Sequence, residues 1–229
     1  MTSRKMNRGG FIVAMFAAAF GLLFVQRYAN ASRAVVVPAP AFDLPSTAKT
    51  ETAVFAGGCF WGIQAVFQHM KGVASATSGY AGGWTDRPSY EMVSSGTTGH
   101  AESVRVTYDP SQVSYATLLK VFFSIAHDPT TLNRQGPDVG TQYRSAIFYM
   151  SAEQKQQADA YVKQLNEAHV FPKPIVTQIV AYKAFFPAED YHQDYAENHP
   201  GDPYIVINDA PKVANLKKHY PDLYRDAIR

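Results

Sequence analysis

Hydrophobic residues along this chain recur with two spacings, which predict strands and helices in alternation. Residues 50–56 form a short apolar run that stops at two glycines, as a buried strand does. Residues 60–70 place apolar side chains three or four positions apart, as one face of a helix does. Because several predicted strands are polar on one side and the last third is irregular, the pattern predicts an α+β fold. We expect a two-layer α/β sandwich around a mixed central sheet with an irregular C-terminal segment, and not a doubly wound sheet. Further strands are predicted at 73–80, 100–108, 143–150 and 174–182, and further helices from Ser114 to before Pro129, at 151–168 and at 211–219.

The strand predicted at 100–108 carries an acidic residue on its apolar face. Glu102 alternates in step with Val104 and Val106, so the pattern points its side chain inward. Glu102 also lies near the start of the strand, where a carboxylate could reach solvent past the edge, and geometry alone leaves both readings open. If Glu102 is buried, the loss of water raises its pKa and keeps it protonated near neutral pH, as a general acid requires.

Two stretches of the chain show no regular spacing. Residues 130–141 form a polar loop, and loops of that length in compact domains are often functional. Residues 185–199 are aromatic and acidic, and precede the terminal helix.

The start of the chain predicts export. Three basic residues precede an uncharged apolar run at 11–25, and Ala29-Asn30-Ala31 offers a cleavage site, so residues 1–31 are interpreted as a secretory signal. The run is short for a spanning helix, which needs roughly 20 residues, but an uncleaved N-terminal anchor stays open. Either way we expect the protein to be periplasmic, released by cleavage or anchored in the membrane and facing the periplasm.

Composition divides the rest of the chain and excludes one class of partner. The proline-rich residues 32–48 are predicted to be an extended tether, and residues 49–229 a single catalytic domain. The formal charge of +2 is small and no Lys/Arg run exceeds two residues, so we expect no nucleic-acid partner.

Cys59 is the sole cysteine, and it stands between two glycines and two large aromatic residues. A lone cysteine is more often a small buried hydrophobe than a nucleophile. Here the glycines permit close backbone approach, and the start of the helix offers amide donors that favour a thiolate, so a nucleophile is the better interpretation. No internal disulfide can form, and the thiol is either free or pairs transiently with another molecule.

Other side chains give weaker signals. Tyr80, Tyr90 and Tyr143 could each donate a phenolic hydrogen bond, although in a chain with 14 tyrosines packing is a better explanation than catalysis for any one of them. We predict no metal, because the grouping of His192 and His199 with Asp190 and Asp194 matches no common zinc spacing.

Taken together, the motifs resemble those of the A-type peptide-methionine sulfoxide reductases. They run in order across about residues 50 to 200, and that order makes the resemblance far more specific than any single motif. The matching segments are Gly58-Cys59-Phe60-Trp61-Gly62, Gly79-Tyr80-Ala81-Gly82-Gly83, Pro88-Ser89-Tyr90-Glu91, Gly99-His100-Ala101-Glu102, His127-Asp128-Pro129-Thr130, Gln135-Gly136 with Asp138, Gly140-Thr141-Gln142-Tyr143-Arg144-Ser145 and Ala188-Glu189-Asp190-Tyr191-His192-Gln193.

The resemblance implies a reaction and a role for each matching residue. It implies thiol-dependent reduction of the S epimer of methionine sulfoxide, protein-bound and possibly free, to methionine, with a sulfenic acid left on the cysteine. By the same resemblance, Cys59 is the nucleophile, Glu102 the acid that protonates the departing oxygen, Tyr90 and Tyr143 the hydroxyls that bind that oxygen, Phe60 and Trp61 the pocket for the S-methyl group, and Asp138 an acidic residue that helps to orient the site.

The chain departs from a common family pattern because it has no resolving cysteine. Many members carry one near the C-terminus, where this chain reads Gly201-Asp202-Pro203-Tyr204, and some carry one in the Tyr90 loop, where it reads Ser94-Ser95. We therefore expect no bound cofactor and an external thiol reductant, either a thioredoxin-like protein or a small thiol. The substrates implied are oxidised proteins or peptides that carry methionine sulfoxide.

Two other functions remain to be weighed against this one. A cysteine hydrolase would use Cys59 as acyl acceptor and a histidine such as His100 as base, but the sequence offers that histidine no clear orienting partner. An exported binding protein would capture methionine in an aromatic cleft without turnover.

Overall fold

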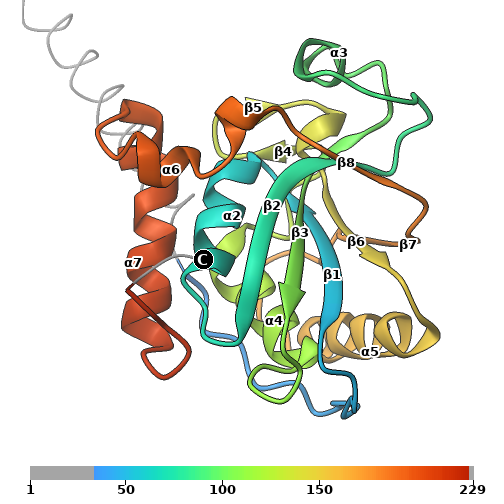
Figure 1. Cartoon of the computed structure of the whole chain (residues 1–229). Helices are drawn as coiled ribbons and strands as arrows, with labels where there is room; N and C mark the ends of the chain where they lie inside the picture. The colour runs from blue at the N-terminus through green and yellow to red at the C-terminus, as the bar shows by residue number, and fades with distance from the viewer. Residues whose placement is uncertain (1–33, 227–229) are drawn as a thin grey trace, which may run out of the picture.

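A six-stranded sheet forms the centre of the computed structural model, which describes residues 34–226 (Figure 1). Its order is β7-β6-β1-β3-β2-β8, and only β6 and β7 pair in parallel, so the sheet is mixed. The α+β prediction is confirmed. The strands are β1 (Glu51–Gly57), β2 (Val73–Ala81), β3 (Ala101–Tyr108), β6 (Ser145–Tyr149), β7 (Gln178–Ala181) and β8 (Phe185–Pro187).

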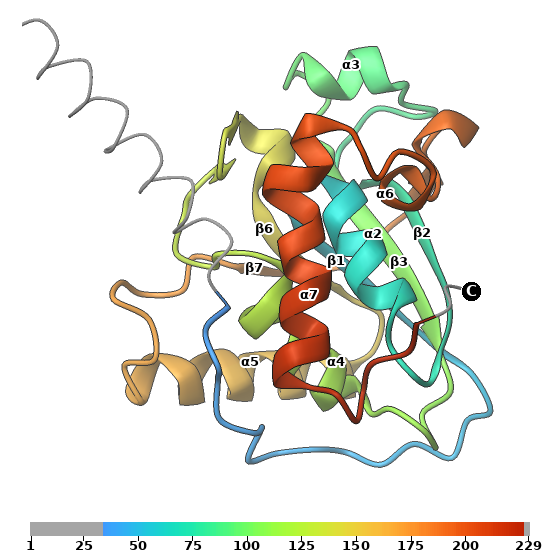
Figure 2. The same cartoon turned by 90° about the vertical axis from the view of Figure 1, so that its left-hand side faces the viewer.

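Helices share one apolar core with the sheet. α2 (Phe60–Gln68) packs on β2 and β3, and α7 (Ala210–His219) packs on the other side of α2 (Figure 2). The ring of Phe55 on β1 stacks on Phe67 at 5.3 Å and on Phe122 at 4.9 Å between ring centroids. Full burial of a ring of this size contributes roughly 1.5–3 kcal/mol. The other long elements are α4 (Tyr115–Val121), which continues as a π-helix (Phe122–Ala126), and α5 (Ala152–Glu167).

The helix starts expected from the sequence are present. Ser114 Oγ accepts a hydrogen bond from the Thr117 amide at 3.2 Å, and Ser151 Oγ accepts one from the Gln154 amide at 3.2 Å. The Gln154 side chain reaches back to the amide of Met150 at 2.9 Å, so a capping arrangement closes the start of α5.

The two aperiodic stretches contain short elements that carry no readable period. Within 130–141 the chain makes a hairpin of two-residue strands, and within 185–199 it forms the edge strand β8 and two single-turn helices. Elements this short bury too few side chains to leave a pattern. The short elements of these stretches are β4 (Arg134–Gln135), β5 (Asp138–Val139), η2 (Thr141–Tyr143), η3 (Asp190–His192) and α6 (Tyr195–Asn198). The two elements not yet named are α3 (Tyr90–Ser94) and the π-helix η4 (Ile205–Asp209).

The segment at 34–50 is extended, and it lies against α5. Tyr161 Oη donates to the carbonyl of Pro38 at 2.7 Å, and Gln164 Nε2 donates to that of Ala39 at 2.8 Å. The predicted signal at 1–31 lies outside the described residues. Within residues 34–226, no helix has the length and apolar character needed to cross a membrane.

Candidate active site

Cys59 occupies the N-cap position of α2, and Gly58 alone separates it from the end of β1. The two glycines before it are required by close neighbours. A Cβ on Gly57 would lie 2.8 Å from His127 Cγ, and one on Gly58, whose φ is +101°, would lie 2.5 Å from Gln135 Cβ. The turn into α2 is thus packed against the His127 and Gln135 side chains, which is the close approach that the glycines predicted.

The Cys59 thiol is buried, with 9% of the residue exposed, and its environment opposes ionisation. Burial raises the pKa of the Cys59 thiol well above its ordinary value, and the carboxyl groups of Glu102 and Asp209 raise it further. A hydrogen bond from the Trp61 amide lowers it by less. The expectation that the helix start would favour a thiolate is therefore wrong, because desolvation and neighbouring carboxyl groups outweigh the amide donor.

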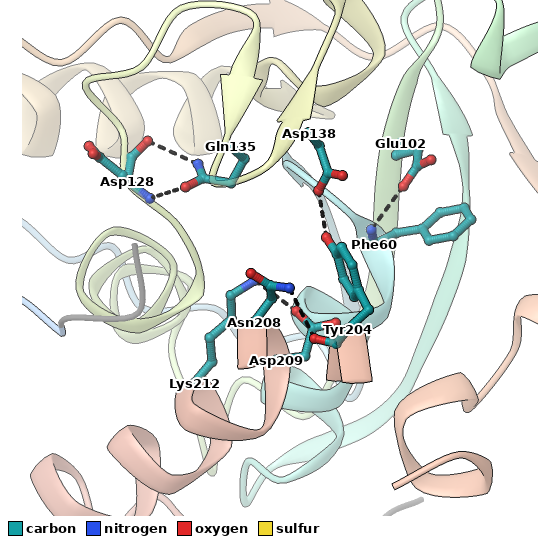
Figure 3. A network of polar contacts seen from close by, with 9 residues as sticks. All are labelled: Phe60, Glu102, Asp128, Gln135, Asp138, Tyr204, Asn208, Asp209 and Lys212. Atoms are coloured by element: carbon teal, nitrogen blue, oxygen red, sulfur yellow. Dashed lines mark hydrogen bonds and ion pairs between the residues drawn. The ribbon is translucent and has the colours of Figure 1, made fainter. Parts of the chain in front are cut away.

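Glu102 faces into the protein, with 2% of the residue exposed, and so settles the alternative that the sequence left open. Its Oε2 accepts a hydrogen bond from the amide of Phe60, the residue after Cys59, at 3.1 Å (Figure 3). Burial raises the pKa of the Glu102 carboxyl to about 8; the Phe60 amide opposes this shift, and Asp138 and Asp209 add to it. A carboxylic acid is thus held protonated at neutral pH next to the start of α2.

Tyr90 and Tyr143 come from separate segments, and the same charged groups shift the pKa values of both phenols. Burial first, then the charges of Glu102 and Asp138, raise the pKa of Tyr143. Burial and the charge of Glu102 also raise the pKa of Tyr90. The hydroxyl groups therefore lie within electrostatic range of the Glu102 carboxyl.

Tyr80 differs from these two because its hydroxyl already donates a hydrogen bond to the carboxylate of Glu189. Tyr80 Oη donates to Glu189 Oε2 at 2.8 Å, and the other oxygen of Glu189 accepts the amide of Tyr90 at 2.9 Å. Glu189 thereby joins β2 to the first residue of α3, which supports Tyr90.

Asp138 lies in the short hairpin and accepts a hydrogen bond from Tyr204 Oη at 2.5 Å (Figure 3). Burial raises the pKa of Asp138, while the Tyr204 hydroxyl and the ammonium of Lys212 act in the opposite direction. The burial of Tyr204 and its hydrogen bond to Asp138 were not predicted, because nothing in its sequence context separates it from the other tyrosines.

Aromatic rings surround the start of α2. Trp61 stacks on Tyr195 with 3.8 Å between ring centroids, and its Nε1 donates to His192 Nδ1 at 3.2 Å. Phe60 is buried and lies 5.1 Å from the His192 ring, which in turn lies 4.4 Å from the ring of Tyr90. Sequence reasoning weighed His192 only as a metal ligand; it is a packing and hydrogen-bonding partner of the two predicted pocket residues.

A buried ion pair, not predicted from the sequence, lies against the first turns of α2. Lys212 Nζ is 3.1 Å from Asp209 Oδ1, and both side chains are almost inaccessible to water. A Cβ on Gly62 would lie 2.1 Å from Asp209 Oδ1, so a glycine is needed for the pair to fit. The available signal was an acid and a base three residues apart at the start of the terminal helix.

Neither the hydrolase nor a metal gains support from the geometry. His100 is buried, with its Nδ1 accepting the amide of Gly83 at 3.2 Å and its Nε2 2.8 Å from the carbonyl of Thr85, so both ring nitrogens are occupied by a loop. Residues 34–226 contain no group of three His, Cys, Asp or Glu side chains placed to hold a metal ion.

Known proteins resemble this chain in both sequence and fold. The family model for peptide methionine sulfoxide reductase matches residues 51–223. A peptide methionine sulfoxide reductase, MsrA 2, from Mesorhizobium japonicum is 60% identical over 177 residues, which cover 77% of this chain and 91% of the relative. The MsrA 2 of Synechocystis is 50% identical over 191 residues, covering 82% of this chain and 89% of the relative.

Solved structures agree with these sequence matches. Reduced Mxr1 from Saccharomyces cerevisiae has a TM-score of 0.60 and 35% identity, covering 70% of this chain and 92% of that one. The methionine sulfoxide reductase A of Corynebacterium diphtheriae has a TM-score of 0.58 and 34% identity, covering 74% and 89%.

This chain belongs to the peptide methionine sulfoxide reductase family. It is an enzyme of the A type, and its activity is the reduction of methionine sulfoxide in peptides. Membership of this enzyme family contradicts the interpretation as a binding protein without turnover.

Proposed function

We propose that Cys59 is the nucleophile of this reductase and that Glu102 supplies the proton for the departing oxygen. The Cys59 sulfur attacks the sulfoxide sulfur and forms an S–S bond while the sulfoxide oxygen receives a proton from Glu102. The hydroxyl then moves from the substrate sulfur to Cys59 Sγ, which breaks the substrate S–O bond and the S–S bond together. The proton of the thiol replaces the one that Glu102 gave. The products are methionine and Cys59 sulfenic acid, so the sulfoxide is reduced by two electrons and Cys59 is oxidised by two.

The observation that carries this proposal is the buried, hydrogen-bonded carboxyl of Glu102. A sulfoxide oxygen leaves poorly until it is protonated, so the site needs an acid that still holds its proton at neutral pH. With a pKa of about 8, raised chiefly by burial, Glu102 meets that requirement, and its hydrogen bond to Phe60 fixes it beside residue 59.

The remaining predicted residues would bind the substrate. Tyr90 and Tyr143 would donate hydrogen bonds to the sulfoxide oxygen, because their hydroxyls sense the same carboxyl group. Phe60 and Trp61 would hold the S-methyl group against aromatic faces. Asp138, fixed by Tyr204, would orient the site.

The family match supports activity on methionine sulfoxide; restriction to the S epimer is our proposal. Reaction of separately prepared S and R epimers of a blocked methionine sulfoxide tests it. We expect conversion of the S epimer, and equal rates with both epimers would contradict the proposal.

Return of Cys59 to the thiol requires a reductant from outside the chain. Because the full sequence has one cysteine, no second thiol of this chain can take the place of the sulfenic hydroxyl within one molecule. A thioredoxin-like protein or a small thiol would therefore form a mixed disulfide directly with Cys59.

A single-turnover experiment without reductant tests these roles. Wild-type enzyme should release about one methionine per Cys59, and intact mass should rise by one oxygen. Cys59→Ser should release none, and Cys59 that stays unmodified during wild-type turnover would overturn the assignment. A monothiol added afterwards should replace the oxygen with a mixed disulfide; turnover without that adduct would count against direct reduction.

We further propose that the enzyme works outside the cytoplasm, either released or anchored. The basic residues, apolar run and small-residue site within 1–31 support export. Cell fractionation and N-terminal sequencing of the protein from its native host test this: a chain starting near Ser32 indicates cleavage, an intact chain in the membrane indicates an anchor, and a cytoplasmic chain contradicts the proposal.

A further inference from the structure

One turn of the chain, residues 189–192, contacts both halves of the proposed sulfoxide site. Glu189 Oε1 accepts a hydrogen bond at 2.9 Å from the amide of Tyr90, whose hydroxyl is proposed to bind the sulfoxide oxygen. His192 Nδ1 accepts one at 3.2 Å from the indole N–H of Trp61, which is proposed to hold the S-methyl group. The amide of His192 donates to the carbonyl of Glu189 at 2.9 Å and closes the turn. Four consecutive residues therefore connect the oxygen-binding half of the site to the methyl-binding half.

Strand β2 holds this turn at both ends. Before the turn, β8 pairs with β2, and the amide of Ala188 donates to the carbonyl of Ser78 at 2.9 Å. After the turn, the side chain of Gln193 donates to the same carbonyl and accepts the amide of Ser78, each at 3.0 Å. The second oxygen of Glu189 accepts a hydrogen bond from Tyr80 Oη, also on β2, at 2.8 Å. The turn is thus fixed to the central sheet, as a support for binding residues must be.

The His192 ring is buried among the aromatic side chains of the site, with 2% of the residue exposed. Its ring centroid lies 5.1 Å from that of Phe60 and 4.4 Å from that of Tyr90, so the ring packs against a residue from each half. Burial lowers the pKa of His192, which keeps the ring neutral near neutral pH. In the neutral ring Nδ1 accepts the indole N–H and Nε2 carries the proton. His192 therefore both orients Trp61 and takes up its one donor.

The stereochemistry of a sulfoxide makes the relative position of the two halves important. If the peptide chain and the face of the sulfur that Cys59 attacks are kept in place, the R epimer differs from the S epimer by exchange of the oxygen and the methyl group. The oxygen of the R epimer would then lie against the rings of Phe60 and Trp61, and its methyl group against the hydroxyls of Tyr90 and Tyr143. A polar oxygen in an apolar pocket is disfavoured unless a donor reaches it.

We propose that Glu189 and His192 are positioning residues that set the preference of this enzyme for the S epimer. This inference rests on the proposed function, which assigns the S epimer and the two halves of the site. Glu189 acts through the backbone of Tyr90 and keeps the oxygen-binding hydroxyl in place. His192 keeps Trp61 in place and occupies the indole N–H, which would otherwise be free to donate to the oxygen of an R epimer.

Two substitutions at His192 separate the hydrogen bond from the packing of the ring. His192→Phe keeps an aromatic ring and removes the acceptor. His192→Asn removes the ring and keeps an acceptor near the place of Nδ1, because the Asn oxygen and Nδ1 are both bonded to Cγ. Single-turnover reactions with excess enzyme, without reductant, give the second-order rate constant for separately prepared S and R epimers of a blocked methionine sulfoxide.

We expect His192→Phe to lower the ratio of the S rate constant to the R rate constant about tenfold, in part through a faster reaction of the R epimer, because the indole N–H is freed. His192→Asn should keep the ratio within about threefold of wild type. An unchanged ratio in His192→Phe, or a larger loss in His192→Asn than in His192→Phe, would overturn the role of the hydrogen bond. A loss of folded enzyme lowers both rate constants equally and leaves their ratio unchanged.

Glu189 is tested by a matched pair at the same position. Glu189→Met removes both acceptors at similar side-chain length, so the ratio should fall about tenfold, mainly through a slower reaction of the S epimer. Glu189→Gln keeps an oxygen for the Tyr90 amide and an NH₂ group that can donate to Tyr80 Oη, so its ratio should stay within about twofold of wild type. If Glu189→Met gives no folded enzyme, Tyr80→Phe removes one of the two hydrogen bonds and should lower the ratio about threefold. A wild-type ratio in the folded variant would overturn the role of Glu189.

The wild-type enzyme separates failure of this inference from failure of the proposed function. Equal rates for the two epimers in wild type would reject the proposed S preference itself. Preference for the S epimer in wild type, with equally strong preference in His192→Phe and Glu189→Met, would reject this inference alone. Weaker preference in these two variants, together with continued methionine release, supports it.

Discussion

Tyr204 and Asp138, which lie 66 residues apart in the chain, are joined by a 2.5 Å hydrogen bond beside the active site. This bond ties the C-terminal segment to the short hairpin. Two segments without strong secondary structure therefore hold each other in place.

The loss of that bond should be measurable as stability. Tyr204→Phe removes the donor and leaves a partly buried carboxylate without it, so we expect a loss of about 1.5–3 kcal/mol in the free energy of unfolding by urea. Tyr149→Phe serves as the control and should change stability by less than about 0.5 kcal/mol. Equal losses in the two variants would mean that the Asp138 contact contributes little.

Replacement of Glu102 should separate binding from chemistry. Glu102→Gln keeps the size of the side chain and an acceptor for the Phe60 amide but removes the proton, so the single-turnover rate should fall by about 10²- to 10⁴-fold. KM should change little. The control is Glu153→Gln on exposed α5, which should match wild type. A wild-type rate in Glu102→Gln would remove Glu102 from the proposed chemistry.

The pH dependence should follow the same carboxyl. Because the reaction starts from protonated Glu102, the single-turnover rate should be flat below about pH 8, the pKa raised by burial, and fall above it. Glu102→Gln should lack this fall. Between the ordinary pKa of 4.5 and about 8, the folded protein holds a proton that the unfolded chain releases. Stability should therefore decline as pH rises through that window, and decline less in the glutamine variant.

Gly62, in α2, and Gly201, in a turn where an added Cβ meets nothing, together test the buried ion pair. Alanine in a helix normally stabilises relative to glycine, but a Cβ at Gly62 would lie 2.1 Å from Asp209 Oδ1, whereas one at Gly201 would meet nothing within 4 Å. Gly62→Ala should cost about 1–3 kcal/mol by thermal or urea unfolding, and Gly201→Ala less than about 0.5 kcal/mol. A neutral Gly62→Ala would show that Asp209 and Lys212 can move aside freely.

The two tryptophans provide a test of the aromatic pocket. Trp61 stacks on Tyr195, whereas Trp84 is 76% exposed. Trp61→Ala should raise KM for a sulfoxide peptide by about tenfold through the loss of one aromatic contact, with a smaller effect on kcat. Trp84→Ala should leave both constants within about twofold. If both variants behave alike, Trp61 does not form the substrate pocket.

Sequence patterns predicted the parts of the site that regular elements position. Strand alternation pointed Glu102 inward, and the change to helical spacing after Cys59 placed the thiol at the start of a helix. Both predictions are local, since a side chain's direction follows from its place in a strand or a helix. The direction of the Glu102 side chain and the place of Cys59 at the start of a helix are therefore the parts of the site that sequence reasoning could reach, while the burial of Glu102 was left open.

The electrostatics of the thiol were not predictable in the same way. The helix start suggested a lowered pKa for Cys59, but burial and the carboxyl groups of Glu102 and Asp209 raise it. Asp209 is brought there from the terminal helix by tertiary packing, which no spacing reveals. The hairpin that carries Asp138 is likewise too short to show a period.

A buried thiol that holds its proton offers little thiolate at neutral pH, so we expect Cys59 to react slowly with small oxidants. Peroxides and small disulfides react with the thiolate, so a buried, acid-flanked Cys59 gives them little to attack. We expect this burial to slow the direct oxidation of Cys59 by the oxidants that convert methionine to its sulfoxide. Because the chain has one cysteine, irreversible oxidation of Cys59 would remove all of its catalytic capacity.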